Sequence, residues 1–250
     1  MEKVSIITPA YNASKFISKT IDSVIGQSYG DWEMLIVDDG SRDNTAEIVS
    51  AYATSDNRIK LIQQTNAGSA AARNNALRNA IGRYVCFLDA DDLWDSDFLS
   101  SQISFMKEKQ CALVFASYRR INEDGEEIMA PFIVPEKVNY KGLLKTCSIS
   151  CLTALYDKNV VGDNYFNENL RSLRDDLVFW LQILKRVPFA YGNKDVLASY
   201  RVFSASTTAN KKKVIKPQFY VYYKVEKLGL VKSVYYLLNW AVNGFKKYHL

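Results

Sequence analysis

The chain has 250 residues, of which 48% are hydrophobic and 24% are charged, and it contains no tract rich in Pro, Gly or Ser. This composition excludes intrinsic disorder and low complexity, and the length allows one large domain with a smaller appendage. The formal net charge is +5, but residues 201–250 hold ten Lys or Arg against one acid, Glu226, so this segment carries +9 and the remainder −4. We therefore expect the two ends of the protein to meet different partners.

The first half of the chain alternates short apolar runs with helically spaced apolar residues. Strands are predicted at residues 4–8, 34–37, 59–62 and 84–88, and helices at residues 16–24, 43–52 and 70–81. Because helices separate the strands, the pattern predicts an α/β fold with a doubly wound, mostly parallel (mixed) sheet flanked by helices. Ligands of such sheets bind beyond the carboxyl ends of the strands, where the polar groups 38–39, 66 and 89–92 follow.

The second half is less regular. A helix is predicted from residue 96, a strand at 112–118 followed by a turn at Asp124-Gly125, a helix within 170–187, and one or two basic, aromatic helices within 214–247. The pattern of residues 126–169 does not resolve into elements. We expect the specificity of the protein to depend on this region.

The four cysteines have no CxxC spacing, and the single histidine, His249, is next to the end of the chain. A structural zinc site is therefore not expected, and a Ser-His-Asp or Cys-His mechanism has no base available. Acid and base chemistry should fall to carboxylates. The first residues run into a strand without the apolar stretch of a secretory signal, so a cytoplasmic protein is expected.

Three carboxylates, Asp89, Asp91 and Asp92, close a predicted buried strand. Residues two apart in an extended chain point the same way, so Asp89 and Asp91 are expected to face one ligand, while Ala90 leaves room for close approach. Hard oxygen ligands suit Mg²⁺ or Mn²⁺, which also bind substrate phosphates. The alternative is that these acids cap the helix predicted from residue 96.

A second acidic pair, Asp38-Asp39, ends another predicted strand and is followed by Gly40 and Ser41. A carboxylate at this place can accept a hydrogen bond from a ribose hydroxyl or from a base N–H. A tight turn in which Ser41 or Asp43 caps the next helix is an equally good interpretation.

Four segments in register resemble a known family. They are Ser5-Ile6-Ile7-Thr8-Pro9-Ala10-Tyr11-Asn12, then Val37-Asp38-Asp39-Gly40-Ser41 with Asp43 and Thr45, then Asn66-Ala67-Gly68 with Ala72-Arg73-Asn74, and finally Leu88-Asp89-Ala90-Asp91-Asp92. Their order and spacing over roughly the first hundred residues are similar to those of the family 2 glycosyltransferases of GT-A fold, of the bacterial surface-polysaccharide type. The resemblance implies an inverting enzyme that uses a nucleotide sugar.

The resemblance also implies that Pro9, Tyr11 and Asp39 line the nucleoside pocket. Asp39 would accept a hydrogen bond from the N3–H of a uracil, so a UDP-sugar donor is favoured. The matching residues further along the chain would lie near the nucleotide (Gly68 and Arg73), near the ribose or sugar (Asp89 with Ala90), and at the metal, Mn²⁺ or Mg²⁺ (Asp91). For Arg73 the simpler alternative is an ion pair with a nearby acid.

Residues 174–180 are similar to the segment in which the family places a Glu-Asp pair at the start of a helix, with the second acid serving as base. Asp176 is therefore assigned as the catalytic base, and Asp175 stands in place of the usual Glu. The alternative is that both are first-turn acids favoured by the helix dipole.

Residues 200–206 resemble a segment that carries a histidine near the donor diphosphate in many relatives. Phe203 has that position here, so protein ligation of the metal would rest mainly on Asp91, with Arg201 and the diphosphate supplying the remaining contacts. The alternative is that Arg201 belongs to a strand end packed on the core.

With this resemblance, we predict a GT-A domain at 1–205, with a nucleotide-binding half at 1–110 and an acceptor half at 111–205, and a C-terminal helical appendage at 206–250. The expected reaction is metal-assisted transfer of a sugar from a UDP-sugar to a hydroxyl of a glycan or lipid-linked glycan, with inversion and with Asp176 taking the proton. A catalytically silent nucleotide- or glycan-binding scaffold of the same fold is the alternative.

The C-terminal tail interleaves lysines with large aromatic residues, and no apolar stretch reaches the ~20 residues that a spanning helix needs. We expect peripheral attachment at the cytoplasmic face of an anionic membrane. The alternatives are a packed helix pair with a solvated basic face, or a homodimer contact. Nucleic-acid binding is not expected, because no recognised motif accompanies the lysines.

Two other classes of protein with acids at strand ends fit less well. A phosphoacceptor receiver domain has an acid pair after its first strand, where this chain has Thr8-Pro9-Ala10. A haloacid-dehalogenase-type phosphatase has a Thr two residues after the second Asp of its Asp-x-Asp motif, where this chain has Leu93.

Overall fold

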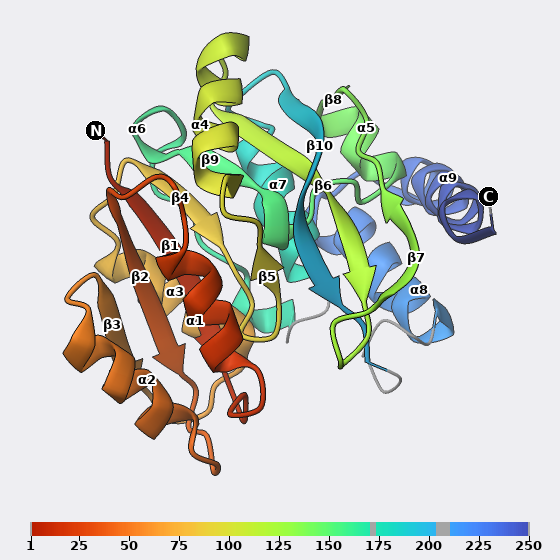
Figure 1. The fold of residues 1–250 in the computed structure, drawn as a ribbon. Helices are drawn as coiled ribbons and strands as arrows, with labels where there is room; N and C mark the ends of the chain where they lie inside the picture. Colours follow the sequence, from red (N-terminus) through yellow and green to blue (C-terminus); the bar gives the residue numbers. More distant parts are fainter. Residues whose placement is uncertain (1, 171–173, 204–210, 250) are drawn as a thin grey trace.

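The computed structural model describes residues 2–170, 174–203 and 211–249. Within them, ten strands form one sheet (Figure 1). In spatial order these are β3 (Ile59–Gln63), β2 (Trp32–Asp38), β1 (Val4–Ala10), β4 (Tyr84–Phe87), β9 (Leu155–Asp157), β6 (Leu113–Ile121), β10 (Ala190–Arg201) and β5 (Leu93–Trp94), with β7 (Glu127–Phe132) beside β6 and β8 (Lys137–Val138) beside β10.

The strand directions place the carboxyl ends of most strands at one edge of the sheet. Strands β3, β2, β1 and β4 are mutually parallel, and β9 is antiparallel to both β4 and β6. Strand β6 therefore runs in the direction of β4, and β10 is parallel to β6. These carboxyl ends meet at the lower edge in Figure 1. The predicted doubly wound, mostly parallel and mixed sheet is confirmed.

Helices cover both faces of the sheet. In chain order they are α1 (Ile17–Ile25), α2 (Thr45–Ser55), α3 (Ser69–Asn79), α4 (Phe98–Lys109), α5 (Tyr140–Lys145), α6 (Lys158–Val161), α7 (Asp175–Ile183), α8 (Lys211–Tyr220) and α9 (Leu230–His249). Short 3₁₀ turns lie at Cys151–Thr153 and Glu168–Leu170, and a π-helical turn at Val221–Val225 follows α8.

Alternate residues of the central strands belong to two hydrophobic cores, one on each face of the sheet. Ile7 packs with α3, α5 and α7 in one core, whereas Ile6 packs with α1 and α4 in the other. Because side chains of a strand alternate between faces, and both faces are covered, the strand sequences are continuous apolar runs rather than alternating ones. The predicted strands were recognisable for this reason.

The C-terminal helices pack against the second half of the domain. Tyr222 is fully buried, and its hydroxyl donates to the carbonyl of Leu144 at 2.5 Å. The side chain of Glu226 is only 2% exposed and pairs with Lys185 at 2.7 Å and with the hydroxyl of Tyr140. The appendage therefore shares a core with the domain, and the predicted boundary near 205 falls outside the described residues. Within the described ranges, none of the helices combines the length and apolar character needed to cross a membrane.

Gly192 in β10 offers a test of this packing. A Cβ atom there would lie 2.0 Å from the carbonyl oxygen of Pro135 and 2.9 Å from the side chain of Val134. Because backbone must move to admit a methyl group, we expect Gly192→Ala to lower the free energy of unfolding by about 1–3 kcal/mol or more. Urea denaturation would measure this loss, and Gly30→Ala, with nothing within 4 Å of its Cβ, should be nearly neutral. Equal stability of the two variants would contradict the prediction.

Candidate active site

The carboxylate of Asp39 organises the loop that precedes α3. One oxygen accepts hydrogen bonds from Gln64 Nε2 and the backbone N–H of Ala67, and the other from the N–H of Gly68, each at 2.8 Å. Gly68 has a φ of 91°, a conformation that favours glycine. A carboxylate offers about four acceptor positions, so Asp39 retains capacity for a further donor such as a base N–H.

Arg73 connects two acids from distant parts of the chain. Its guanidinium lies 2.6 Å from Asp89 after β4 and 3.6 Å from Asp175 at the start of α7, and its cationic carbon is 5.3 Å from the ring centre of Phe166. The residue is 8% exposed. Burial opposes its charge, but the two carboxylates outweigh burial and raise the pKa of Arg73 above its usual value. The ion pair weighed for Arg73 is therefore present.

Residues 89–92 form a turn rather than an extension of β4, because the N–H of Asp92 donates to the carbonyl of Asp89 at 3.1 Å. The Asp92 carboxylate is buried and accepts from the N–H of Arg201 at 2.7 Å. Burial, with the charges of Asp91 and Asp89, raises the pKa of Asp92 well above its usual value. Burial and the Asp89 charge likewise raise the pKa of Asp91 to about 6. The turn thus concentrates negative charge.

The three acids do not form one ligand set. No group of three His, Cys, Asp or Glu side chains in the described part of the chain is arranged to hold a metal ion. Asp89 is bound to Arg73, and Asp92 to the backbone of Arg201, which leaves Asp91 as the acid not committed to these contacts. A single carboxylate with substrate phosphates is an adequate donor set for Mg²⁺ or Mn²⁺, so Asp91 fits such a cation.

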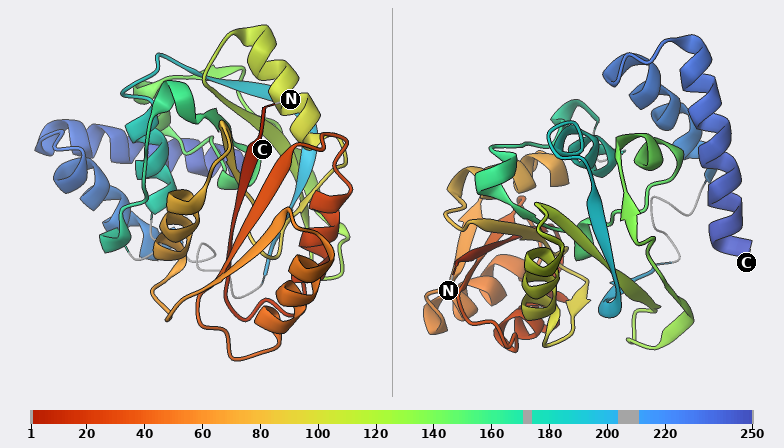
Figure 2. Two further views of the ribbon diagram at one scale, coloured as in Figure 1. Left: turned by 90° about the vertical axis from the view of Figure 1, so that its left-hand side faces the viewer. Right: turned by 90° about the horizontal axis from the view of Figure 1, so that it is seen from above.

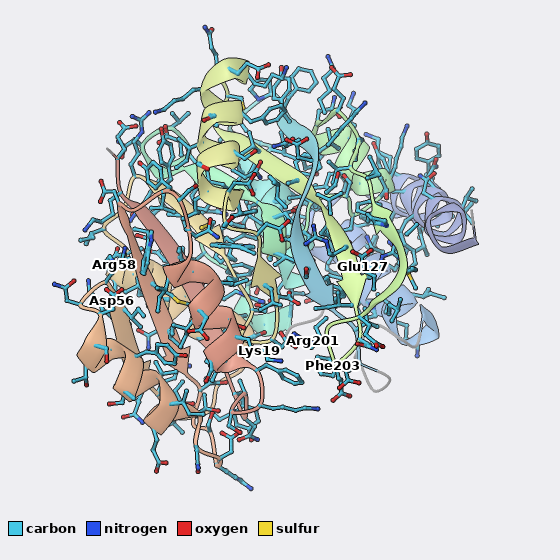
Figure 3. The ribbon with its side chains drawn as sticks, in the orientation of Figure 1. Lys19, Asp56, Arg58, Glu127, Arg201 and Phe203 are labelled. Carbon is cyan, nitrogen blue, oxygen red and sulfur yellow. The ribbon has the colours of Figure 1, made fainter. Side chains whose placement is uncertain are left out.

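The guanidinium of Arg201 binds backbone carbonyls. It donates to the carbonyls of Asp91, Asn122 and Glu123, each at 2.8 Å, and lies 4.7 Å from the ring centre of Phe16. Phe203 lies close to Arg201 in Figure 3. Its ring contacts the ring of Phe16 edge-on, with the two ring centroids 5.5 Å apart. Arg201 therefore holds the acidic turn in place, and its expected contact with a diphosphate stays a prediction.

Asp175 and Asp176 occupy the first turn of α7, after Arg174 in a left-handed conformation (φ 65°). Asp175 is buried, and its Oδ2 has no hydrogen-bond partner among the described residues. Burial raises the pKa of Asp175, and the charge of Arg73 partly offsets this. Asp176 is half-buried; its Oδ1 accepts from the N–H of Leu177 at 2.7 Å, and Cys147 Sγ lies 4.0 Å from its Oδ2.

Two supporting residues escaped prediction from the sequence. The hydroxyl of Thr20 donates to the carbonyls of Ala90 at 3.0 Å and Asp92 at 2.9 Å, so α1 fixes the acidic turn. Gln64 braces Asp39 as described above. The signal for Thr20 was available, because it is a polar residue on the apolar stripe of α1 that includes Ile17 and Ile21.

A doubly wound sheet with acids, the Gly68 turn and an acid-bearing helix at one rim is typical of enzymes that bind a nucleotide at that rim. The family model "Glycosyl transferase family 2" matches residues 5–161, and the chain belongs to this family. It is a glycosyltransferase, as the resemblance implied.

Two curated relatives align over almost the whole chain. A putative teichuronic acid biosynthesis glycosyltransferase, TuaG of Bacillus subtilis (strain 168), is 41% identical over 245 residues, 98% of this chain and 96% of the relative. WfgD of Escherichia coli, a UDP-Glc:alpha-D-GlcNAc-diphosphoundecaprenol beta-1,3-glucosyltransferase, is 40% identical over 98% of this chain and 94% of its own.

Solved structures support the GT-A fold. TarS 1–349 of S. aureus, in complex with UDP, is 24% identical with a TM-score of 0.69 over 89% of this chain and 66% of that chain. The mannosyltransferase PcManGT of Pyrobaculum calidifontis, in complex with GDP-Man and Mn²⁺, is 21% identical with a TM-score of 0.69 over 94% of this chain and 70% of that chain. At these identities the likeness concerns the fold.

Proposed function

We propose that this glycosyltransferase moves a sugar from a UDP-sugar, with inversion, to a hydroxyl of a saccharide carried on a lipid diphosphate, at the cytoplasmic face of the membrane. The observation that carries the proposal is the link Asp89–Arg73–Asp175 through the buried guanidinium of Arg73, which connects the acidic turn after β4 to the helix that bears Asp176. The relatives' names supply the chemical class: WfgD uses a UDP-sugar and a diphosphoundecaprenol-linked acceptor.

The donor site is assigned to the loops after β1, β2 and β3. Tyr11 is exposed beside Pro9 at the end of β1, where an aromatic ring can stack on a base. Asp39 retains an acceptor position for the N3–H of uracil, and Gly68 lets the backbone approach the nucleotide. Asp89 and Ala90 face the ribose or sugar in this assignment.

The metal site is assigned to Asp91. A bound Mn²⁺ or Mg²⁺ would stabilise the negative charge that develops on the departing diphosphate. Arg201 and Thr20 hold the turn, so the backbone that carries the Asp91 carboxylate has a fixed place. On the opposite side of the sugar, Asp176 takes the proton of the acceptor hydroxyl as that oxygen attacks the anomeric carbon, which inverts the configuration. The silent-scaffold alternative finds no support, because each of these carboxylates is present.

Titration of UDP tests the donor half of this proposal. With Mn²⁺ present, we expect Asp91→Asn to weaken UDP binding at least tenfold, because loss of even an indirect metal contact costs about 10–100-fold in metal affinity. Isothermal titration with and without Mn²⁺ measures this, followed by turnover of UDP-sugars on a lipid-diphosphate-linked saccharide. Asp97→Asn, an exposed carboxylate before α4, is the matched control and should bind like wild type. Metal-independent binding that survives Asp91→Asn would refute the metal assignment.

A further inference from the structure

Helix α9 is apolar on two faces, of which only one packs on the protein. Tyr236 and Leu237 lie against the core shared with α5 and α7. The opposite face exposes large hydrophobic side chains, with Val231 83% and Leu238 62% accessible. The residues of this outward face are Leu230, Val231, Val234, Tyr235, Leu238 and Val242. At helical spacing these six residues fall within one arc, and none of them is charged.

The inward face fixes the direction in which the outward face points. The side-chain amide of Asn243 donates to the carbonyl of Lys145 at 3.1 Å, and the ring of Tyr236 lies 6.0 Å from that of Tyr222. The guanidinium of Arg174 lies 5.0 Å from the ring centre of Trp240. Helix α9 is thus attached to the domain between Tyr236 and Asn243, and Figure 2 shows it at the margin of the molecule, far from β2 and β3. The fold therefore presents the outward face to its surroundings.

The exposed charged side chains described in the C-terminal segment have one sign. The exposed side chains of Lys216, Lys224, Lys227 and Lys232 lie on α8, α9 and the turns between them. Glu226, the one acid among residues 201–250, is buried against Lys185 and Tyr140 and does not offset them at the surface. An exposed apolar helical face on a segment whose exposed charges are lysines matches the interface of a bilayer that contains anionic lipids.

We infer that the outward face of α9 docks the enzyme on an anionic lipid bilayer, with α9 parallel to the surface. A second copy of this chain is a poorer occupant, because a two-fold contact would bring two C-terminal segments (residues 206–250) of charge +8 against each other. The inference goes beyond the proposed function and rests on this surface alone. If the acceptor is lipid-linked as proposed, docking brings it near the reaction site, because Trp240 of α9 contacts Arg174, which directly precedes Asp175.

Vesicle flotation tests the inference with the full chain and without substrate. Wild type should float with phosphatidylcholine vesicles that contain phosphatidylglycerol, and less with rising salt or without the anionic lipid. Val231→Glu/Leu238→Glu should reduce the bound fraction about tenfold or more, because two carboxylates enter the apolar arc. The matched control is Ile81→Glu/Val160→Glu, which places the same charges at residues 70% and 60% exposed on other elements, and it should float like wild type.

Three outcomes would overturn the inference. Wild type could fail to float with anionic vesicles, the α9 variant could float like wild type, or the control variant could lose flotation to the same extent as the α9 variant. Sedimentation velocity without lipid identifies the competing occupant, since a dimer abolished by the α9 substitutions alone, with no flotation, would assign the face to a second copy. Turnover of a water-soluble, short-chain diphosphate acceptor tests the proposed function independently of membrane docking. The α9 variant should retain that turnover whether or not docking is correct.

Discussion

Asp176→Asn is expected to lower kcat by about 10²–10⁴-fold, because general-base catalysis by a positioned side chain contributes about that factor. An amide has nearly the shape of the carboxylate but cannot take the proton of the acceptor hydroxyl. Asp176 is half-buried in the first turn of α7, one residue after the acid that Arg73 ties to the acidic turn. Initial rates of sugar transfer, measured over a range of acceptor concentrations, would report the change.

The affinity for UDP separates a catalytic loss from a folding loss in this experiment. We expect Asp176→Asn to bind UDP with Mn²⁺ as wild type does, because Asp176 is assigned to the acceptor side of the sugar. Asp163→Asn, an exposed carboxylate after α6, should leave both kcat and UDP affinity unchanged. A kcat for Asp176→Asn close to the wild-type value would show that another group serves as base.

The repeating β-α pattern made the first hundred residues predictable, whereas the acidic turn was predicted less well. Strand periodicity suggested that Asp89 and Asp91 face one ligand, but β4 ends at Phe87 and the following residues turn. The carboxylate of Asp89 therefore binds Arg73, although its charge still raises the pKa of Asp91. An argument from alternation holds only while the chain stays extended, and the sequence did not show where the strand ends.

The region from residue 126 to 169 escaped prediction for a different reason. Between residues 126 and 169 the elements include β8 with two residues, β9 with three and α6 with four. Such elements are shorter than the run of about 4–8 residues for a strand, or about 10 or more for a helix, over which a hydrophobic pattern can be read, so no pattern can reveal them. The contact between Arg73 and Asp175 joins residues far apart in sequence, and a single sequence has no signal for it. Helix α9 has apolar residues on two faces, so the sequence did not show which face packs on the domain.

Arg73→Met should have the largest effect on stability, about 3–5 kcal/mol at neutral pH, because it leaves the buried carboxylate of Asp175 without its compensating charge. Arg73 also binds Asp89, but that side chain is 37% exposed and water can solvate it. The second substitution Asp175→Asn should recover part of the loss, since it removes the charge that needs a partner. Arg78→Met, on the same helix in an exposed pair with Glu168, is the control and should change stability by about 0–1 kcal/mol.

The effect of Arg73→Met should depend on pH with a definite sign. In the folded protein burial raises the pKa of Asp175 above the value of about 4 expected in the unfolded chain, and removing Arg73 raises it further. The folded variant then holds a proton that the unfolded chain releases, so its stability falls as pH rises from about 4 through the folded-state pKa. Urea denaturation from acidic to neutral pH should show a deficit that grows with pH, and Asp175→Asn should remove this dependence. A deficit that is constant with pH, and that Asp175→Asn does not relieve, would mean that Arg73 stabilises the fold through its packing on Phe166 rather than through its charge.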